Sequence, residues 1–224
     1  MAKEQPYGGT IRFKEIMDTL NAHLDNLSTF VVKMIQDGIT ALANDDEKLF
    51  NVTKIDLEKV HKICYLLEDT ISSSIALHQP FARDLRFILS TLKISNEIHR
   101  SAHDAVHIAH SSSFIDQKLH SEIVGKIAQL ADKASSMFKD AVEAFRKRKA
   151  LDVNTWTLLD NNVDNLHSEI IEEIVKIMIN DPAWARAGTS LILATRYIER
   201  IADHACNIVE ESIYVVTSKR VKIE

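Results

Sequence analysis

The chain has few of the residues that interrupt helices, with only five glycines and three prolines in 224 residues. Glycine and proline mark turns and helix ends, so a chain that has few of them contains few breaks. Alternation of apolar and polar residues, the pattern of a half-buried strand, is also hard to find. We therefore predict an all-α protein with long helices.

Other scarcities exclude whole classes of protein. The two cysteines, Cys64 and Cys206, cannot form a disulfide framework, so we expect a reducing, cytoplasmic environment. No stretch approaches the about 18 uninterrupted apolar residues of a membrane span. Residues 1–10 lack the apolar core of a signal peptide. The formal net charge of −5 disfavours nucleic acid as the main partner.

Apolar residues at helical spacing predict six helices, each about 30 residues and about 45 Å long. Their expected ranges are 10–43, 47–77, 81–113, 115–149, 152–179 and 183–217. On the first two helices the expected core residues include Phe13, Ile16, Leu20, Leu27, Val31, Met34, Val52, Ile55, Val60, Ile63, Leu67 and Ile71. A short basic tail, residues 218–224, is expected to be mobile.

The third and sixth helices repeat one another at an offset of 100 residues. Ile98, Arg100, Ala102, Ala105 and Ile108 recur as Ile198, Arg200, Ala202, Ala205 and Ile208. An offset of 103 aligns the earlier helices, for example Val60 with Val163. The chain is therefore predicted to form two tandem, internally repeated antiparallel three-helix bundles, residues 11–113 and 114–218.

A polar stripe borders the apolar face of the sixth helix. Glu199, Asp203, Asn207 and Glu210 project within an arc of about 80°. Such oxygen ligands could hold a metal cation. The alternative is a solvated acidic edge that pairs with neighbouring arginines, Arg196 among them. The residues alone leave both interpretations open.

The fifth helix carries a similar border of Asp160, Asp164 and His167. In an antiparallel pair of helices, two such borders either converge on one groove or diverge. Convergence would place at least four carboxylates around one site. Their pKa values would then rise unless a cation neutralised them. Cys206, like Cys64, is more often a buried small hydrophobe than a ligand.

Histidines occupy the equivalent positions in the first half. His99, His103, His107 and His110 align with the stripe of the sixth helix, and His61 aligns with Asp164. Imidazole suits zinc, nickel, copper or iron, whereas carboxylate suits iron, manganese or magnesium. The alternative is a polar edge that titrates near pH 6.5 without metal.

Two segments resemble the signature of the PhoU family of phosphate-uptake regulators: YIERIADH at residues 197–204, followed by Asn207, and LDNNVD at residues 159–164. Gln79–Pro80 followed by residues 83–86 resembles the family's loop between second and third helices. The resemblance covers residues 11–217. It implies cytoplasmic proteins with paired three-helix bundles and multinuclear metal clusters, typically iron, on E/D-xxx-D motifs.

The ligand role carries over, residue by residue, to Asp160, Asp164, Glu199 and Asp203. His107, His110, His167, Asn207 and Glu210 are further candidate ligands. The first half departs from the motif, with Leu57 and His61 in place of one acid pair and His99 and His103 in place of the other. There we expect a different metal (zinc, nickel or iron), a smaller site, or none.

The resemblance also implies a function. Such a protein acts with the phosphate ABC transporter, through its ATPase subunit, and with a membrane sensor histidine kinase, and it restrains uptake and signalling when phosphate is plentiful. Membrane association is then expected only through partners, nucleic acid is not bound directly, and a homodimer is left open. No activated nucleophile or Gly-rich phosphate loop is recognisable, which favours a non-enzyme.

Two alternatives stay open. One is a di-metal helical-bundle enzyme, because Asp164 and His167 form one i,i+3 acid–histidine pair of the kind that such bundles use. The second pair that these enzymes need is missing from the sequence. The other alternative is a structural helical protein whose polar stripes are only solvated edges.

Overall fold

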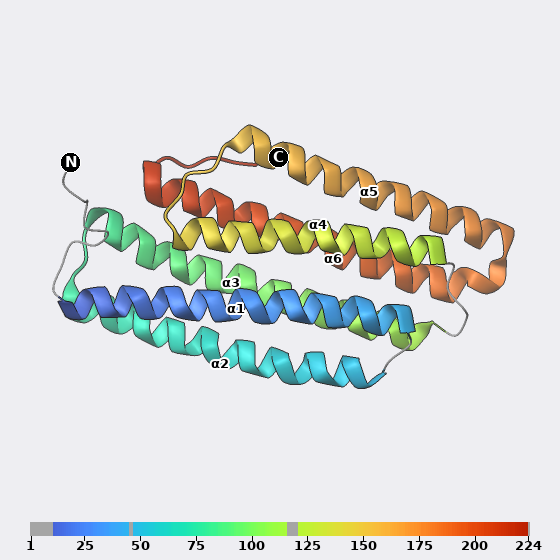
Figure 1. Cartoon of the computed structure of the whole chain (residues 1–224), viewed down its shortest axis with the longest axis horizontal. Coiled ribbons are helices and arrows are strands. Elements are labelled where there is room, and N and C mark those ends of the chain that lie inside the picture. Colours follow the sequence, from blue (N-terminus) through green and yellow to red (C-terminus); the bar gives the residue numbers. More distant parts are fainter. Residues whose placement is uncertain (1–10, 45–46, 116–120, 224) are drawn as a thin grey trace.

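Six long helices dominate this computed structural model, which describes residues 11–44, 47–115 and 121–223 (Figure 1). They are α1 (Ile11–Asn44), α2 (Glu47–His78), α3 (Ala82–Ser111), α4 (Ser121–Arg146), α5 (Val153–Asn180) and α6 (Ala185–Thr217). Single 3-10 turns follow α3 (Ser112–Phe114) and precede α6 (Pro182–Trp184). The predicted all-α fold of six helices is confirmed. Within the described residues, no helix has the length and hydropathy of a membrane span.

Local chemistry explains the helix ends. The Asp152 carboxylate accepts a hydrogen bond of 2.8 Å from the Thr155 backbone N–H, which caps the start of α5. Arg148 has a positive φ of 51°, the left-handed conformation that commonly ends a helix, and it follows the last turn of α4. The fourth helix therefore ends at Arg146 rather than at Lys149. Part of its predicted start, residues 116–120, lies outside the described residues.

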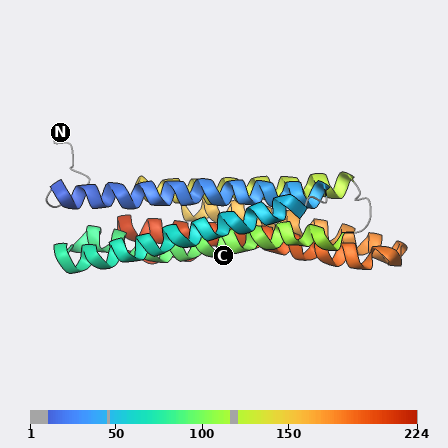
Figure 2. The same cartoon turned by 90° about the horizontal axis from the view of Figure 1, so that it is seen from below.

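Consecutive helices run antiparallel, and four of them share one core. Figure 2 shows α1 and α4 in one layer and α3 and α6 in the other. α2 lies on the outer flank of the first repeat and α5 on that of the second. The core is continuous between the repeats, where for example Phe87 of α3 stacks on Phe145 of α4 with 4.8 Å between ring centroids. Trp156 and Trp184 are buried, as expected for packing residues.

The predicted core face of α2 is wrong near the start of the helix. Val52 and Ile55 are 37% and 59% exposed, whereas Thr53 and Asp56 are buried. The Asp56 carboxylate lies 2.9 Å from Lys33 Nζ and 2.7 Å from Lys59 Nζ. Burial alone would raise the pKa of Asp56, but the hydrogen bonds from the two lysines lower it. A paired acid can therefore occupy a position that hydropathy assigns to an apolar residue.

The C-terminal tail is held against α6, contrary to the expectation of a mobile segment. The Ile223 side chain is buried, and its backbone N–H donates to Glu210 Oε1 at 3.0 Å. The Arg220 guanidinium lies 3.5 Å from the centroid of the Tyr214 ring, within the range of a cation–π contact. The tail therefore adds packing and charge contacts to the second repeat.

Candidate metal centres

α3 and α6 cross in antiparallel orientation, and some residues of their polar stripes contact the opposite helix there. Glu97 of α3 accepts a hydrogen bond of 3.1 Å from Asn207 of α6. At the equivalent place on the other side, Tyr197 of α6 stacks on His107 of α3, with ring centroids 4.8 Å apart. Asn207 and His107 were both candidate ligands, and both side chains here join one repeat to the other.

His204 lies at the centre of this crossing, buried between two acids of α3. Its Nδ1 is 2.7 Å from Glu97 Oε2, and its Nε2 is 3.3 Å from Asp104 Oδ2. Burial alone would lower the pKa of His204, but the hydrogen bonds with Asp104 and Glu97 raise it. Arg200 also pairs with Asp104, at 3.4 Å. The junction of the repeats is therefore a charged network within an apolar core.

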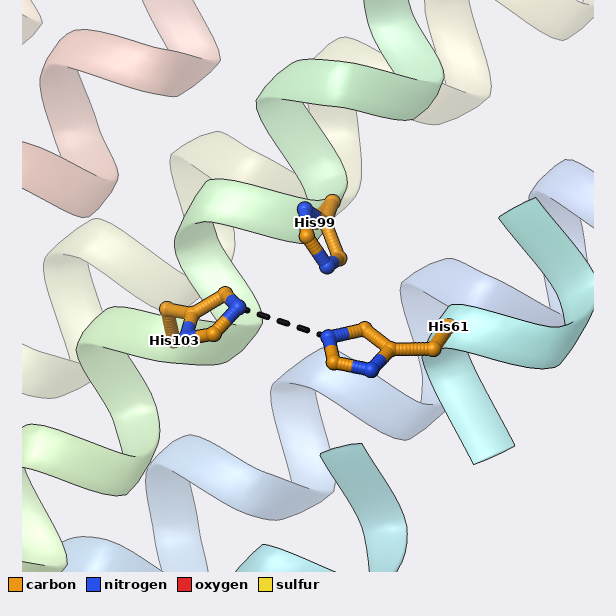
Figure 3. A group of neighbouring side chains, drawn as sticks. All are labelled: His61, His99 and His103. Atoms are coloured by element: carbon orange, nitrogen blue, oxygen red, sulfur yellow. Dashed lines mark hydrogen bonds between the residues drawn. The ribbon is translucent and has the colours of Figure 1, made fainter. Parts of the chain in front are cut away.

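Three other histidines of the first repeat lie close together. His61 of α2 faces His99 and His103 of α3 (Figure 3). One potential ligand atom from each residue lies within 4.8 Å of the other two. The Nε2 atoms of His61 and His103 are 3.4 Å apart. We call these three residues the imidazole triad.

The surroundings of His99 and His103 favour uncharged rings. Burial, followed by the charges of His103 and His61, lowers the pKa of His99 to about 4. The pKa of His103 is also lowered, first by burial and then by the charge of His61. Neutral imidazole is the form that binds a metal ion, so at pH 7 these two rings need lose no proton to act as ligands.

Three further residues of the first repeat have other contacts. His110 stacks on Phe50, with ring centroids 4.9 Å apart. Cys64 donates a weak hydrogen bond to the Ser95 carbonyl oxygen over 3.8 Å, and burial raises the pKa of its thiol to about 12. Leu57, at the position of an acid in the second repeat, packs against the core. The triad is therefore the group of first-repeat donors that the fold gathers.

In the second repeat the acidic borders of α5 and α6 face one another. Burial, and then repulsion by Asp203 and Asp164, raises the pKa of Glu199 to about 7. Burial also raises the pKa of Asp203, and the charge of Asp164 raises it further. The pKa of Asp160 is raised in the same way, by burial and then by Asp164 and Asp203. Cys206 of α6 lies 3.4 Å from Asp160 of α5, so the two borders meet at this contact.

The acids nevertheless stay further apart than the imidazoles. Among the described residues, only the imidazole triad brings three such donor atoms within 4.8 Å of one another. Arg196 binds Glu199 through one carboxylate oxygen, and the other, Glu199 Oε2, is buried without a hydrogen-bond partner in the described chain. His167 Nε2 is likewise buried without a partner there. These buried atoms lack a hydrogen-bond partner and lie beside acids that repel one another. They are therefore suitable ligands for a cation.

The other second-repeat candidates have partners. Glu210 accepts from the Ile223 backbone and lies 3.5 Å from Lys222 Nζ, so the tail engages it. Asp160 accepts a hydrogen bond from Cys206 Sγ at 3.4 Å. The cysteine is buried, and its pKa is raised, so it acts as a neutral thiol beside the acids.

The PhoU domain family matches residues 24–112 and 127–212 of this chain. The chain belongs to the PhoU family. A relative from Clostridium acetobutylicum, named phosphate-specific transport system accessory protein PhoU homolog, is 29% identical over 212 residues, which cover 94% of this chain and 97% of that protein. A relative of the same name from Pseudomonas putida is 27% identical and covers 94% of this chain and 83% of its own length.

Solved PhoU structures share the fold. The crystal structure of PhoU from Pseudomonas aeruginosa superposes with a TM-score of 0.85 at 24% identity, over 92% of this chain and 100% of that one. The phosphate transport system regulatory protein PhoU from Streptococcus pneumoniae gives a TM-score of 0.84 at 22% identity, over 94% and 99%. These similarities establish the fold of this PhoU-family chain.

The charged junction of the PhoU repeats was not predicted from the sequence. Asp104 and His204 are equivalent residues at the offset of 100, yet neither was selected as a functional candidate. A polar residue at the same place in both repeats, within an apolar stripe, was the available signal. An antiparallel crossing of equivalent helices brings equivalent positions together, so such a pair is expected to meet.

Proposed function

We propose that this PhoU-family protein is an accessory regulator of a phosphate transport system. The observation that carries the proposal is the relative from Clostridium acetobutylicum, named an accessory protein of such a system, which aligns with 94% of this chain and 97% of its own length. A match across both repeats favours a shared role for the whole chain. We further propose that the protein acts in the cytoplasm, without catalysis, by binding the transporter's ATPase subunit and a sensor histidine kinase.

Within this function, the acids of the second repeat are the proposed iron site. Asp160 and Asp164 from α5 with Glu199 and Asp203 from α6 supply the carboxylates, and His167 supplies one further donor. Support comes from the buried, unpaired Glu199 Oε2 and His167 Nε2, which a cation would satisfy. Bound iron would neutralise the acids and tie α5 to α6. Arg196 would have to release Glu199 as the metal enters.

The regulatory role is tested in the producing organism. A strain that lacks the protein should take up phosphate without the normal restraint in phosphate-rich medium, and the wild-type chain should restore it. Co-immunoprecipitation should recover the ATPase subunit, to different extents in high and low phosphate. Normal uptake in the deletion strain, together with no recovery of the subunit in either medium, would refute the proposal.

The enzyme alternative has its own test. Metal-loaded protein is assayed with hydrogen peroxide and with a chromogenic phosphoester. We expect no turnover above that of the free metal. Multiple turnovers that disappear in the variant D160N/D164N/E199Q/D203N would favour the di-metal enzyme instead.

A further inference from the structure

The first repeat contains a second donor set whose chemistry differs from that of the acids. We propose that His61, His99 and His103 bind one tetrahedral transition-metal ion of the zinc class, with the fourth position open to water. This inference goes beyond the proposed function and stands whether or not the acids of the second repeat bind iron.

The separation of two ring nitrogens fits a tetrahedron. Zinc–imidazole bonds of about 2.0–2.1 Å place neighbouring ligand atoms about 3.3 Å apart around a tetrahedral ion. Octahedral coordination with the same bonds would bring them to about 3.0 Å or less. The observed distance between His61 Nε2 and His103 Nε2 is 3.4 Å. In the metal-free chain the same two nitrogens can share a long hydrogen bond, which a bound ion would replace.

The third imidazole is placed to complete the set. The His99 ring centroid lies 4.5 Å from that of His61 and 4.7 Å from that of His103. His99 and His103 are one turn apart on α3, the i,i+4 spacing by which a single helix directs two imidazoles at one zinc ion. Figure 3 shows the His61 ring entering from α2 to face both. Rotation about the His99 side-chain bonds would bring its nitrogen to bonding distance.

The composition of the group selects the ion. It contains three imidazoles and no carboxylate, which disfavours magnesium, calcium and manganese. Cys64 is not a member, since its thiol is turned to the Ser95 carbonyl oxygen. The three rings are each half-buried, so solvent can reach the remaining side. Three protein ligands and a water molecule are the pattern of an open zinc site.

The test uses cobalt(II), which takes the place of zinc and whose absorption spectrum distinguishes tetrahedral from octahedral coordination. Untagged, metal-stripped wild-type chain is titrated with cobalt and then with competing zinc. The variants H61Q, H99Q and H103Q are compared with H23Q, a histidine of α1 outside the group. Each titration is repeated with proteins that also carry D160N/D164N/E199Q/D203N. A loss of metal binding at the acids then cannot be mistaken for a loss at the imidazoles.

We expect one equivalent of tetrahedral cobalt, displaced by zinc, in the wild type, in H23Q and in the acid-neutralised background. Each triad substitution should weaken binding at least about a hundredfold, since even outer-shell changes cost 10–100-fold. An octahedral spectrum alone, or equal affinity in H61Q and H23Q, would overturn the proposal. If the triad variants lose helicity, X-ray absorption of zinc-loaded wild type decides, since three imidazoles at about 2.0 Å support the site and fewer exclude it.

Discussion

The two repeats place different donors at equivalent positions, and the donors behave differently. His61, His99 and His103 of the first repeat align with Asp164, Glu199 and Asp203 of the second. The imidazoles gather within 4.8 Å of one another, whereas no three acids of the described chain do so. Neutral rings can approach without a counter-ion, but carboxylates repel and resist desolvation. We therefore propose that the imidazoles are gathered before a metal ion binds, whereas the acids come together only when a cation is bound.

Arg196 is a further difference between the two repeats. It pairs with Glu199 and so supplies the positive charge that a metal ion would bring. The first repeat has no such need at its imidazoles. Its equivalent residue is Asn96, which carries no charge. We infer that metal entry into the second repeat is an exchange of cations, while entry into the first is simple addition.

The largest expected effect separates the two sites by metal content. D160N/D164N/E199Q/D203N should lose nearly all bound iron, because it removes every carboxylate of the proposed site. H61Q/H99Q/H103Q should retain that iron. Elemental analysis of untagged proteins checks this, with E172Q on the exposed face of α5 as the control. If the acid variant keeps its iron and the histidine variant loses it, the iron site lies at the imidazoles instead.

The next effect concerns the junction that joins the repeats. His204→Ala leaves the buried Asp104 and the half-buried Glu97 without the imidazole between them, and breaking a buried charge network by removing one member typically costs about 3–5 kcal/mol. We expect a loss of this order in the free energy of unfolding, measured by urea denaturation of the metal-free protein. His23→Ala is the control. A loss below about 1 kcal/mol would mean that the network contributes little to the junction.

The two sites should also respond to pH in opposite senses. Glu199 has a folded pKa raised to about 7, so its contribution to stability is full below its unfolded pKa near 4.5 and is lost as pH rises through 7. Metal-free wild type should lose about 2 kcal/mol relative to E199Q between pH 4.5 and pH 8. Urea denaturation at a series of pH values measures this difference. Parallel pH curves for the two proteins would contradict the burial and repulsion inferred for Glu199.

The pH dependence of stability expected for His99 is opposite to that expected for Glu199. Its folded pKa is lowered to about 4, so its contribution is full above pH 6.5 and is lost as pH falls toward 4. Wild type should therefore weaken relative to H99Q by about 1–2 kcal/mol on acidification from pH 7 to pH 4. The same denaturation series provides the measurement, with H23Q as the reference. A wild type that gained stability over H99Q on acidification would show a charged, not a neutral, ring.

The smallest effect concerns the outer faces, where the repeats should be alike. Ile55 of α2 and Leu158 of α5 are equivalent at the offset of 103, and both are exposed. I55Q and L158Q should each change the free energy of unfolding by no more than about 0.5 kcal/mol. Thermal denaturation against wild type checks both. A large loss in only one of them would mean that one outer face is covered in solution.

Much of this architecture follows from periodicity. The six helices and their duplication are visible in the sequence because apolar residues recur at helical spacing over long, uninterrupted segments. Val52 and Ile55 were wrongly placed in the core because hydropathy cannot anticipate that Lys33 and Lys59 neutralise a buried Asp56. The contacts of the tail also depend on particular pairs, such as Arg220 on Tyr214.

The candidate sites were only partly predictable. The donor types and their register are written in the sequence, but whether two helix borders converge depends on how each helix is rotated about its axis. The rotation of a helix about its axis also decides which residues of its polar stripe belong to a site. His107 and Asn207 continue the stripes of their helices, yet the crossing of α3 and α6 turns both toward the opposite repeat.

The most direct test of two chemically distinct sites is a crystal of untagged protein grown with both iron and zinc and measured at the two absorption edges. We expect zinc anomalous density bonded to His61, His99 and His103, and iron density between α5 and α6 at Asp160, Asp164, Glu199 and Asp203. The same metal at both places, or zinc among the acids with none at the imidazoles, would contradict this expectation.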